Sequence, residues 1–481
     1  MKPANCIVLL SDEHNRDVSG CYGHPMVQTP NIDRLAERGT RFTNAYTNCP
    51  ICVPARASMA TGRYVHQIGN WDNGFPYDGS DRSWHRELRD RGIRVDSIGK
   101  LHFRAVGEDH GFTEEIDALQ VVDGVGDILG CLRDDPPQRH KRSGIEEAGP
   151  GDSSYLRYDV SNADRACGWI ADHSADANPW VLFVGFVLPH PPYIAPPDLF
   201  DSYPIDDIEL PPQWESSQWP DHPALAHLRW MFDYQEPFTE EIIRRLHAAY
   251  YGACTHLDRQ IGRVIDAVEE CGIAESTRLI YTSDHGESLG ARGLVGKFTM
   301  YDESAAVPMI LAGPDVPSGI SRSTPVSLVD LFPTLLESVG ASSEDGEDKR
   351  PGESLWRIAT ESDRDRIVFS EYHAVGSRRG YFMVRDARYK LVYYVNESPQ
   401  LFDLVDDPGE LIDRSADERF REVRTRLEAK LQRIVDPEAV DARARSDQAA
   451  VVERHGGREM VVARGAFDNS PVPGDEAIFH L

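Results

Sequence analysis

The densest group of residues that could do chemistry is the segment Cys52-Val-Pro-Ala-Arg56-Ala-Ser-Met-Ala-Thr61-Gly62. Its arginine follows the cysteine by four residues, which is about one turn of a helix. Four further motifs carry polar side chains, several of them after predicted strands: Ser11-Asp12-Glu13, Gly99-Lys100-Leu101-His102, Pro189-His190-Pro191, and Ser283-Asp284-His285-Gly286 with Lys297 downstream. Acids, imidazoles and lysines together indicate a metal-assisted site for an anionic substrate.

The acids predict the metal ligands. Asp12 and Asp284 each follow a predicted strand and supply hard oxygen ligands suited to Ca²⁺, Mg²⁺ or Mn²⁺. His285 adds an imidazole, which shifts the balance toward Mn²⁺. Glu13 is a further candidate ligand with a longer side chain. Each acid taken alone has an ordinary explanation, because aspartate after a strand is commonly a cap or turn residue. The coincidence of five motifs favours the chemical interpretation.

The Cys52 segment, closed by Thr61-Gly62, resembles the signature of the type I, formylglycine-dependent sulfatases of the alkaline-phosphatase-like superfamily. The other four motifs follow in that family's order, and the segment from Gln400 to Glu410 is similar to its C-terminal domain. Within the family, the segments around Asp12, Cys52 and Asp284 look most similar to those of the bacterial choline-sulfatase-like and phosphonate-monoester-hydrolase-like members. Glu13 departs from the Asp-Asp pair common in the family.

The resemblance implies that Cys52 is oxidised to formylglycine (3-oxoalanine) by a formylglycine-generating enzyme. One hydroxyl of the resulting gem-diol would bind one divalent metal ion, Ca²⁺, Mn²⁺ or Mg²⁺, and attack sulfur in line. Arg56 would orient this nucleophile, while Lys100 and Lys297 would bind the sulfate oxygens.

Two histidines complete the implied mechanism. His190 would bind the substrate and protonate the leaving alkoxide, and His102 would be the base that removes a proton from the second hydroxyl to expel sulfate. Trp71 and Asn73 follow the signature closely and are candidates for lining the substrate pocket, where Trp71 could pack against a cationic or sugar substituent. A packed loop after the signature helix explains these two residues equally well.

We therefore predict a sulfuric ester hydrolase that cleaves small sulfate monoesters into sulfate and an alcohol. The alternative is a phosphonate monoester or phosphodiester hydrolase with the same nucleophile and metal, because both substrates leave a single negative charge near the ion. A third hypothesis is a non-catalytic, metal-binding homologue whose Cys52 is never converted. Aryl, choline and carbohydrate sulfates all stay open as substrates.

Net charge, cysteine spacing and the first apolar run indicate which partners, structural classes and cellular location to expect. The 481 residues carry a formal net charge of −28, which argues against nucleic acid or an anionic membrane as a partner. Local positive charge must therefore attract an anionic substrate. Eight cysteines without regular spacing fit neither a zinc motif nor a disulfide scaffold. The first apolar run is interpreted as a strand and not as a signal peptide, so we expect a cytoplasmic protein.

Alternating strand and helix patterns predict an α/β fold: a three-layer α/β/α sandwich with a mostly parallel central sheet, of the alkaline-phosphatase-like kind. Ligands bind such sheets at the carboxyl ends of strands. We expect strands at 5–11, 93–98, 180–187, 278–282 and 307–311, and helices from 29, over 239–271 and over 328–339.

The second half of the chain changes character. Residues 342–350 are predicted to be a linker, and short strands at 367–372, 380–385 and 390–394 with a helix over 416–433 predict a small antiparallel subdomain. The predicted domains are a catalytic domain (1–365), a small α+β subdomain (366–433) and a tail (434–481). The tail is expected to hold one helix near 437–455 and an irregular end. The resemblance implies that such a tail contacts a neighbouring subunit in a homo-oligomer, a dimer or tetramer.

Overall fold

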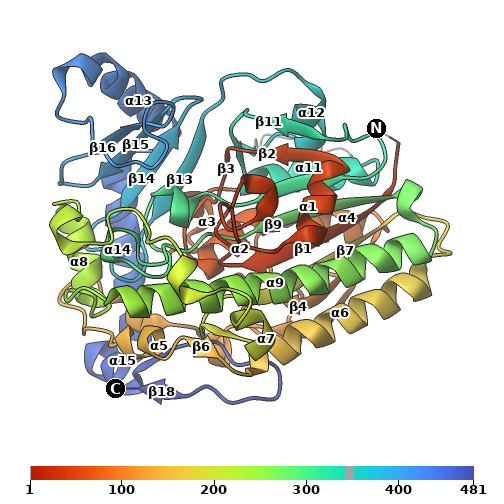
Figure 1. Cartoon of the computed structure of the whole chain (residues 1–481), viewed down its shortest axis with the longest axis horizontal. Coiled ribbons are helices and arrows are strands. Elements are labelled where there is room, and N and C mark those ends of the chain that lie inside the picture. Colours follow the sequence, from red (N-terminus) through yellow and green to blue (C-terminus); the bar gives the residue numbers. More distant parts are fainter. Residues whose placement is uncertain (1, 342–349, 481) are drawn as a thin grey trace.

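An eight-stranded sheet runs through the larger part of the molecule (Figure 1). The computed structural model describes residues 2–341 and 350–480. The strands lie in the order β11–β2–β10–β9–β1–β7–β4–β5. Their bounds are Ile320–Arg322 (β11), Gly39–Phe42 (β2), Met309–Ala312 (β10), Thr277–Ser283 (β9), Asn5–Asp12 (β1), Trp180–Pro189 (β7), Arg94–Lys100 (β4) and Glu114–Leu119 (β5).

The predicted mostly parallel sheet is confirmed, with one exception at β10. Strands β9, β1, β7, β4 and β5 are parallel to one another, whereas β10 pairs antiparallel with both β9 and β2. Every residue of β7 is buried, because the strand has a partner on each side and helices cover both faces. This environment explains its continuous apolar sequence.

Helices cover both faces of the sheet, which gives the expected three layers (Figure 1). Alternate side chains of β1 point to opposite faces, so that Ile7 and Leu9 join one core cluster while Val8 and Leu10 join another. The first cluster packs under α1 (Pro30–Glu37), α6 (Ser154–His173) and α9 (Glu240–Glu270). The second packs under α2 (Cys52–Thr61), α4 (Trp84–Asp90), α11 (Leu331–Ser338) and α12 (Leu355–Thr360).

A separate four-stranded antiparallel sheet follows, as the sequence predicts. It consists of β13 (Val368–Tyr372), β14 (Tyr381–Arg385), β15 (Tyr389–Tyr394) and β16 (Gln400–Asp403), and the sequence analysis missed β16. Helix α13 (Arg421–Ile434) packs Leu427 and Leu431 against this sheet. The predicted linker at 342–350 lies outside the described residues, apart from Arg350.

The tail is more ordered than the sequence predicts. Helix α14 (Pro437–Arg454) is followed by α15 (Gly457–Arg464) and by two short paired strands, β17 (Ala466–Phe467) and β18 (Phe479–His480). The expected irregular end is therefore wrong in part. Two glycines at the start of α15 and a polar sequence conceal the helix. Helix α14 packs on its own chain. Its Ala444 belongs to a third cluster of buried apolar residues, the main core, which also contains Trp71, Tyr250 and Phe402, and its Asp441 pairs with Arg133 at 3.0 Å.

The remaining elements are short. No helix among residues 2–341 and 350–480 is both long and apolar enough to cross a membrane. The remaining short elements are β3 (Ala45–Tyr46), α3 (Val65–Ile68), α5 (Arg142–Glu146), β6 (Gly149–Pro150), β8 (Ile194–Ala195), α7 (Pro197–Phe200), α8 (Pro223–Met231), α10 (Asp302–Ala305) and β12 (Val326–Ser327).

Candidate active site

Two neighbouring parallel strands place the predicted acidic ligands side by side. Ser11 at the end of β1 pairs with Ser283 at the end of β9, so the next residues, Asp12 and Asp284, share one edge of the sheet. Both carboxylates are fully buried. The Asp284 Oδ1 atom accepts hydrogen bonds from the backbone N–H of Glu13 (3.2 Å) and of His285 (3.0 Å). This register sets the position of both acids.

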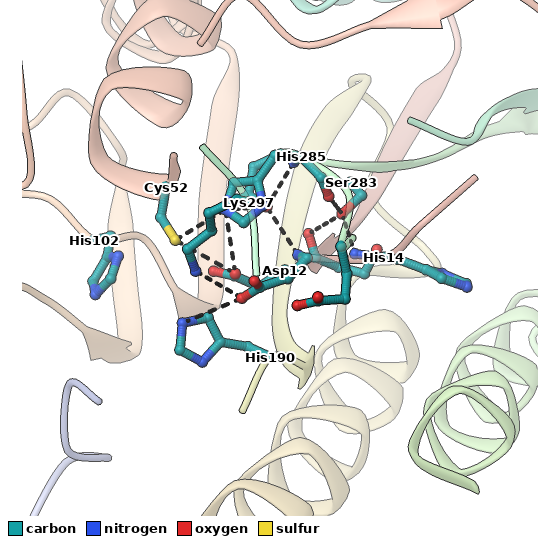
Figure 2. A network of polar contacts seen from close by, with 12 residues as sticks. Asp12, His14, Cys52, His102, His190, Ser283, His285 and Lys297 are labelled. Atoms are coloured by element: carbon teal, nitrogen blue, oxygen red, sulfur yellow. Dashed lines mark hydrogen bonds and ion pairs between the residues drawn. The ribbon is translucent and has the colours of Figure 1, made fainter. Parts of the chain in front are cut away.

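Cys52 is the first residue of helix α2 and points at these acids (Figure 2). Its Sγ atom lies 3.5 Å from Asp12 Oδ1 and 3.1 Å from His285 Nε2. Pro54 is tolerated because the first helical turn has no intrahelical acceptor for its missing N–H. Gly62 ends the helix in the left-handed conformation, with φ of 65°.

The Cys52 thiol would be a poor nucleophile as it stands. Burial, together with the Asp12 carboxylate, raises the pKa of Cys52 to about 12. The thiol is therefore protonated at neutral pH, whereas a reactive cysteine requires a thiolate.

Four buried side chains form a donor set for a metal ion. Asp12, Cys52, Asp284 and His285 each offer one ligand atom, and these atoms all lie within 4.8 Å of one another. The backbone carbonyl of Gly286 accepts a hydrogen bond from His285 Nδ1 (3.1 Å), which leaves Nε2, 3.1 Å from the Cys52 sulfur, as the ring atom that can bind a metal ion. Two carboxylates and an imidazole acceptor fit a divalent cation.

Arg56 lies one helical turn after Cys52 in α2 and forms hydrogen bonds with two members of this donor set. Its guanidinium donates to Asp284 Oδ2 (2.7 Å), to Asp12 Oδ2 (3.1 Å) and to the backbone carbonyl of Lys100 (2.9 Å). Burial alone would raise the pKa of Asp12, but Lys100, His190 and Arg56 hold that pKa well below its usual range. Both acids are thus kept in place by a single planar cation.

Lys100 and His102 come from the end of β4. The Lys100 Nζ atom lies 2.6 Å from Asp12 Oδ2. Gly99 precedes it with φ of 89°, and a Cβ at that position would lie 2.2 Å from the carbonyl oxygen of Gly185. Only glycine therefore allows β4 to approach β7 closely enough to deliver Lys100 to Asp12. His102 is buried, and its Nε2 atom lies 2.8 Å from the hydroxyl of Ser470.

His190 and Lys297 both lie close to Asp12 (Figure 2). The Pro191 carbonyl accepts a hydrogen bond from His190 Nδ1 (2.7 Å), so a neutral ring has its lone pair on Nε2. Burial and the cations Lys297 and Lys100 hold the pKa of His190 well below the usual histidine value. A general acid at Nε2 therefore requires a second proton on this ring.

Glu13 does not join the four-donor group. Its Oε2 atom accepts a hydrogen bond from Lys297 Nζ at 2.6 Å, and Glu13 groups with Asp12 and His190 instead. Burial alone would lower the pKa of Lys297, but the neighbouring carboxylates of Glu13 and Asp12 raise it well above the ordinary lysine value. Glu13 thus holds a charged lysine in the site, a role the sequence analysis did not foresee.

The two residues expected to line the pocket differ in position. Trp71 is fully buried in the main core, and its Nε1–H donates to Asp447 on α14 at 2.8 Å. Its ring offers no exposed surface for a substituent, so the expected stacking role does not fit the structure. Asn73 lies at the site, because its Oδ1 atom accepts a hydrogen bond from the backbone N–H of Val53 in the first turn of α2, at 3.2 Å.

The site also contains residues that sequence reasoning missed. Ser470 contacts His102, and the carbonyl of Ser470 accepts a hydrogen bond from the hydroxyl of Tyr155 in α6, at 2.6 Å. Neither residue belongs to a recognisable motif. The run Asp468-Asn469-Ser470-Pro471 would by composition indicate only a turn.

Buried acids, three cations and histidines at the carboxyl edge of a parallel sheet define a hydrolase site for an anionic ester. The chain matches the Sulfatase family over residues 4–341, and the N-sulphoglucosamine sulphohydrolase, C-terminal, family over residues 290–436. The chain therefore belongs to the sulfatase family and is a sulfuric ester hydrolase.

Individual relatives agree with this assignment. The chain is 31% identical over 471 residues to a choline-sulfatase of Rhizobium meliloti (strain 1021), covering 92% of this chain and 89% of that protein. It is 29% identical over 471 residues to arylsulfatase K of Bos taurus, covering 91% and 83%. A crystal structure of a phosphonate monoester hydrolase of Agrobacterium radiobacter has the same fold, with a TM-score of 0.72, 24% identity and coverage of 90% and 95%.

Proposed function

We propose that this chain hydrolyses small sulfate monoesters with Cys52 converted to formylglycine. The observation that carries the proposal is the position of Cys52, at the start of α2 and within 3.5 Å of Asp12 and 3.1 Å of His285. Support for a sulfate substrate comes from the choline-sulfatase and arylsulfatase K relatives. Formylglycine would supply a hydrated aldehyde, whose hydroxyl group is a far better nucleophile than the protonated thiol.

The proposed metal is a single divalent ion, Ca²⁺, Mn²⁺ or Mg²⁺. Asp12, Asp284 and His285 would hold it together with residue 52, because these buried donors converge. When bound, the ion would supply positive charge that polarises the sulfate oxygens. Metal analysis of the purified protein decides which ion it is.

The chain's own residues account for binding and proton transfer. Lys100 and Lys297 would bind the sulfate oxygens and offset the charge that develops on them, and Arg56 would keep the two carboxylates oriented. His190 would carry a proton on Nε2 to the departing alcohol oxygen once an anionic substrate stabilises its protonated form. His102 would accept a proton during sulfate release. These roles remain predictions.

The test compares two ester classes on one enzyme. The chain is co-expressed with a formylglycine-generating enzyme, and kcat/KM is measured for an aryl sulfate and for the matching aryl phosphonate monoester. We expect preference for the sulfate, and a loss of about 10⁴-fold or more in Cys52→Ala, because the nucleophile is removed. Cys49→Ala, three residues away and also buried, is the matched control and should keep its activity.

Other outcomes have distinct meanings. Preference for the phosphonate would assign the chain to phosphonate monoester or phosphodiester hydrolysis. Turnover of neither ester, with the aldehyde verified by peptide mass spectrometry, would contradict action on simple sulfate esters. An unconverted Cys52 despite the converting enzyme would favour a non-catalytic homologue. The cytoplasmic location and the homo-oligomeric state also remain predictions, which cell fractionation and light scattering test.

A further inference from the structure

The C-terminal loop between β17 and β18, residues 468–478, contacts the site at His102. The Ser470 hydroxyl lies 2.8 Å from His102 Nε2, and the Ser470 carbonyl accepts the hydrogen bond from Tyr155. Both side chains of the Ser470–His102 pair are buried. Figure 2 shows the C-terminal segment, in faint blue, on the side of the His102 ring away from Cys52.

Several contacts hold this loop on its own chain. Asp468 forms an ion pair with Lys141, and the side-chain amide of Asn469, when oriented so that its nitrogen faces an acceptor, donates to the Pro191 carbonyl at 2.9 Å. Strands β17 and β18 pair with each other and close the loop at its base. The contact between Ser470 and His102 therefore belongs to a loop that also has contacts with its own chain at Asp468 and Asn469.

The His102 ring has two different nitrogen environments. Nε2 meets Ser470, whereas Nδ1 is buried and has no hydrogen-bond partner among the described residues. Burial and the cations Lys100 and Arg56 keep the pKa of His102 well below the usual value, so the ring is neutral and carries one N–H and one lone pair. The neutral ring can accept a proton only at the nitrogen that does not already carry the hydrogen.

We propose that Ser470 is a positioning residue for His102. Its hydroxyl oxygen accepts the Nε2 hydrogen and leaves the lone pair on Nδ1, the nitrogen that takes up the proton during sulfate release. The opposite tautomer would place the hydrogen on Nδ1, within a ring that already lies in the field of the cations Lys100 and Arg56. It would also leave a buried donor without a partner among the described residues, at a cost of about 1–3 kcal/mol.

Two substitutions whose side chains have the same shape test the role of the Ser470 hydroxyl group alone. Ser470→Thr keeps the oxygen, and Ser470→Val replaces it with a methyl group on the same branched side chain. The first readout is the His102 tautomer in the full, unconverted chain, measured by ¹H–¹⁵N correlation of ¹⁵N-histidine-labelled protein. A His102→Gln spectrum assigns the signal. We expect the hydrogen on Nε2 in the unsubstituted chain and in Ser470→Thr, and a mixture of tautomers in Ser470→Val.

The second readout is kinetic and uses the converted enzyme. Because sulfate release follows release of the alcohol, losing the positioned base should lower kcat by about 10-fold in Ser470→Val with a much smaller change in kcat/KM. An initial burst of alcohol should accompany this change. Ser470→Thr should stay within about 3-fold of the unsubstituted enzyme.

The outcomes separate this inference from the proposed function on which it rests. A hydrogen on Nδ1 in the unsubstituted chain would overturn the inference, and so would equal kcat values for the two variants. Parallel losses of kcat and melting temperature in both variants would show a merely structural role. If the unsubstituted converted enzyme cleaves no ester, the proposed function fails, yet the tautomer comparison still decides what Ser470 does.

Discussion

The two sides of the Cys52 site are built in different ways. On one side Asp12 and Lys100 end strands of the central sheet and Asp284 follows one, and the hydrogen-bonded register of these strands brings the three residues together. On the other side Ser470 comes from a loop more than three hundred residues further along the chain than His102, which it contacts. On the first side a buried sheet fixes the positions of the charged side chains. On the second side a single hydroxyl group contacts one histidine ring, and we propose that it sets the tautomer of that ring. We therefore expect perturbations on the sheet side to cost far more activity.

Metal removal should have the largest effect, because the ion would bind at the sheet side. Dialysis against a chelator should lower kcat/KM by about 10³-fold or more, since the ion offsets charge in the transition state. It should also lower the melting temperature, because an ion that binds only the folded state stabilises it. Ca²⁺, Mn²⁺ and Mg²⁺ are then added back separately. Full activity after exhaustive removal, verified by metal analysis, would refute the metal assignment.

Arg56→Lys is expected to come next. A lysine cannot reproduce the planar fork that bonds Asp12, Asp284 and the Lys100 carbonyl, so kcat/KM should fall by about 10²-fold or more. Arg366→Lys is the matched control, because Arg366 forms a similar two-point pair with buried Asp330, at 2.6 and 2.7 Å, outside the site. Urea unfolding should show destabilisation of both variants. Equal activity losses would mean that Arg56 acts only through stability.

Deleting residues 465–481 should have a smaller effect on activity. Within this segment only Gly465 and Ser470 are buried among the described residues, so the melting temperature should change little. Loss of the Ser470 contact should lower kcat by about 10-fold. Light scattering of the same sample measures the oligomer. A changed mass would support the expected contact with a neighbouring subunit, and unchanged kcat would remove the C-terminal loop from the mechanism.

Trp71→Phe should have the smallest effect. The variant keeps an aromatic ring in the core but loses the hydrogen bond to Asp447, which should cost about 1 kcal/mol of unfolding free energy. Values of kcat/KM should remain within about 2-fold of the unsubstituted enzyme, because the ring is buried away from any substrate surface. A KM increased by about 10-fold would restore the sequence-based hypothesis that this ring contacts the substrate.

Much of the sheet side could be predicted from sequence. Alternating apolar runs and helical patterns indicate the mostly parallel sheet, and residues that follow its strands must meet at one edge. The Cys52 segment carries its own helix signals, with Pro54 in the first turn and Gly62 at the end. Local patterns of this kind specify which residues can act together.

Only the tertiary structure decided the rest. The antiparallel β10, the pairing of Glu13 with Lys297, the burial of Trp71 against α14 and the contact of Ser470 with His102 each depend on segments distant in sequence. None of them has a local signature, because burial and long-range hydrogen bonds arise only when the layers pack. The sequence by itself determined the sulfatase family and its chemical groups, while packing determined which partner each group meets and therefore which nitrogen of His102 is left to accept a proton.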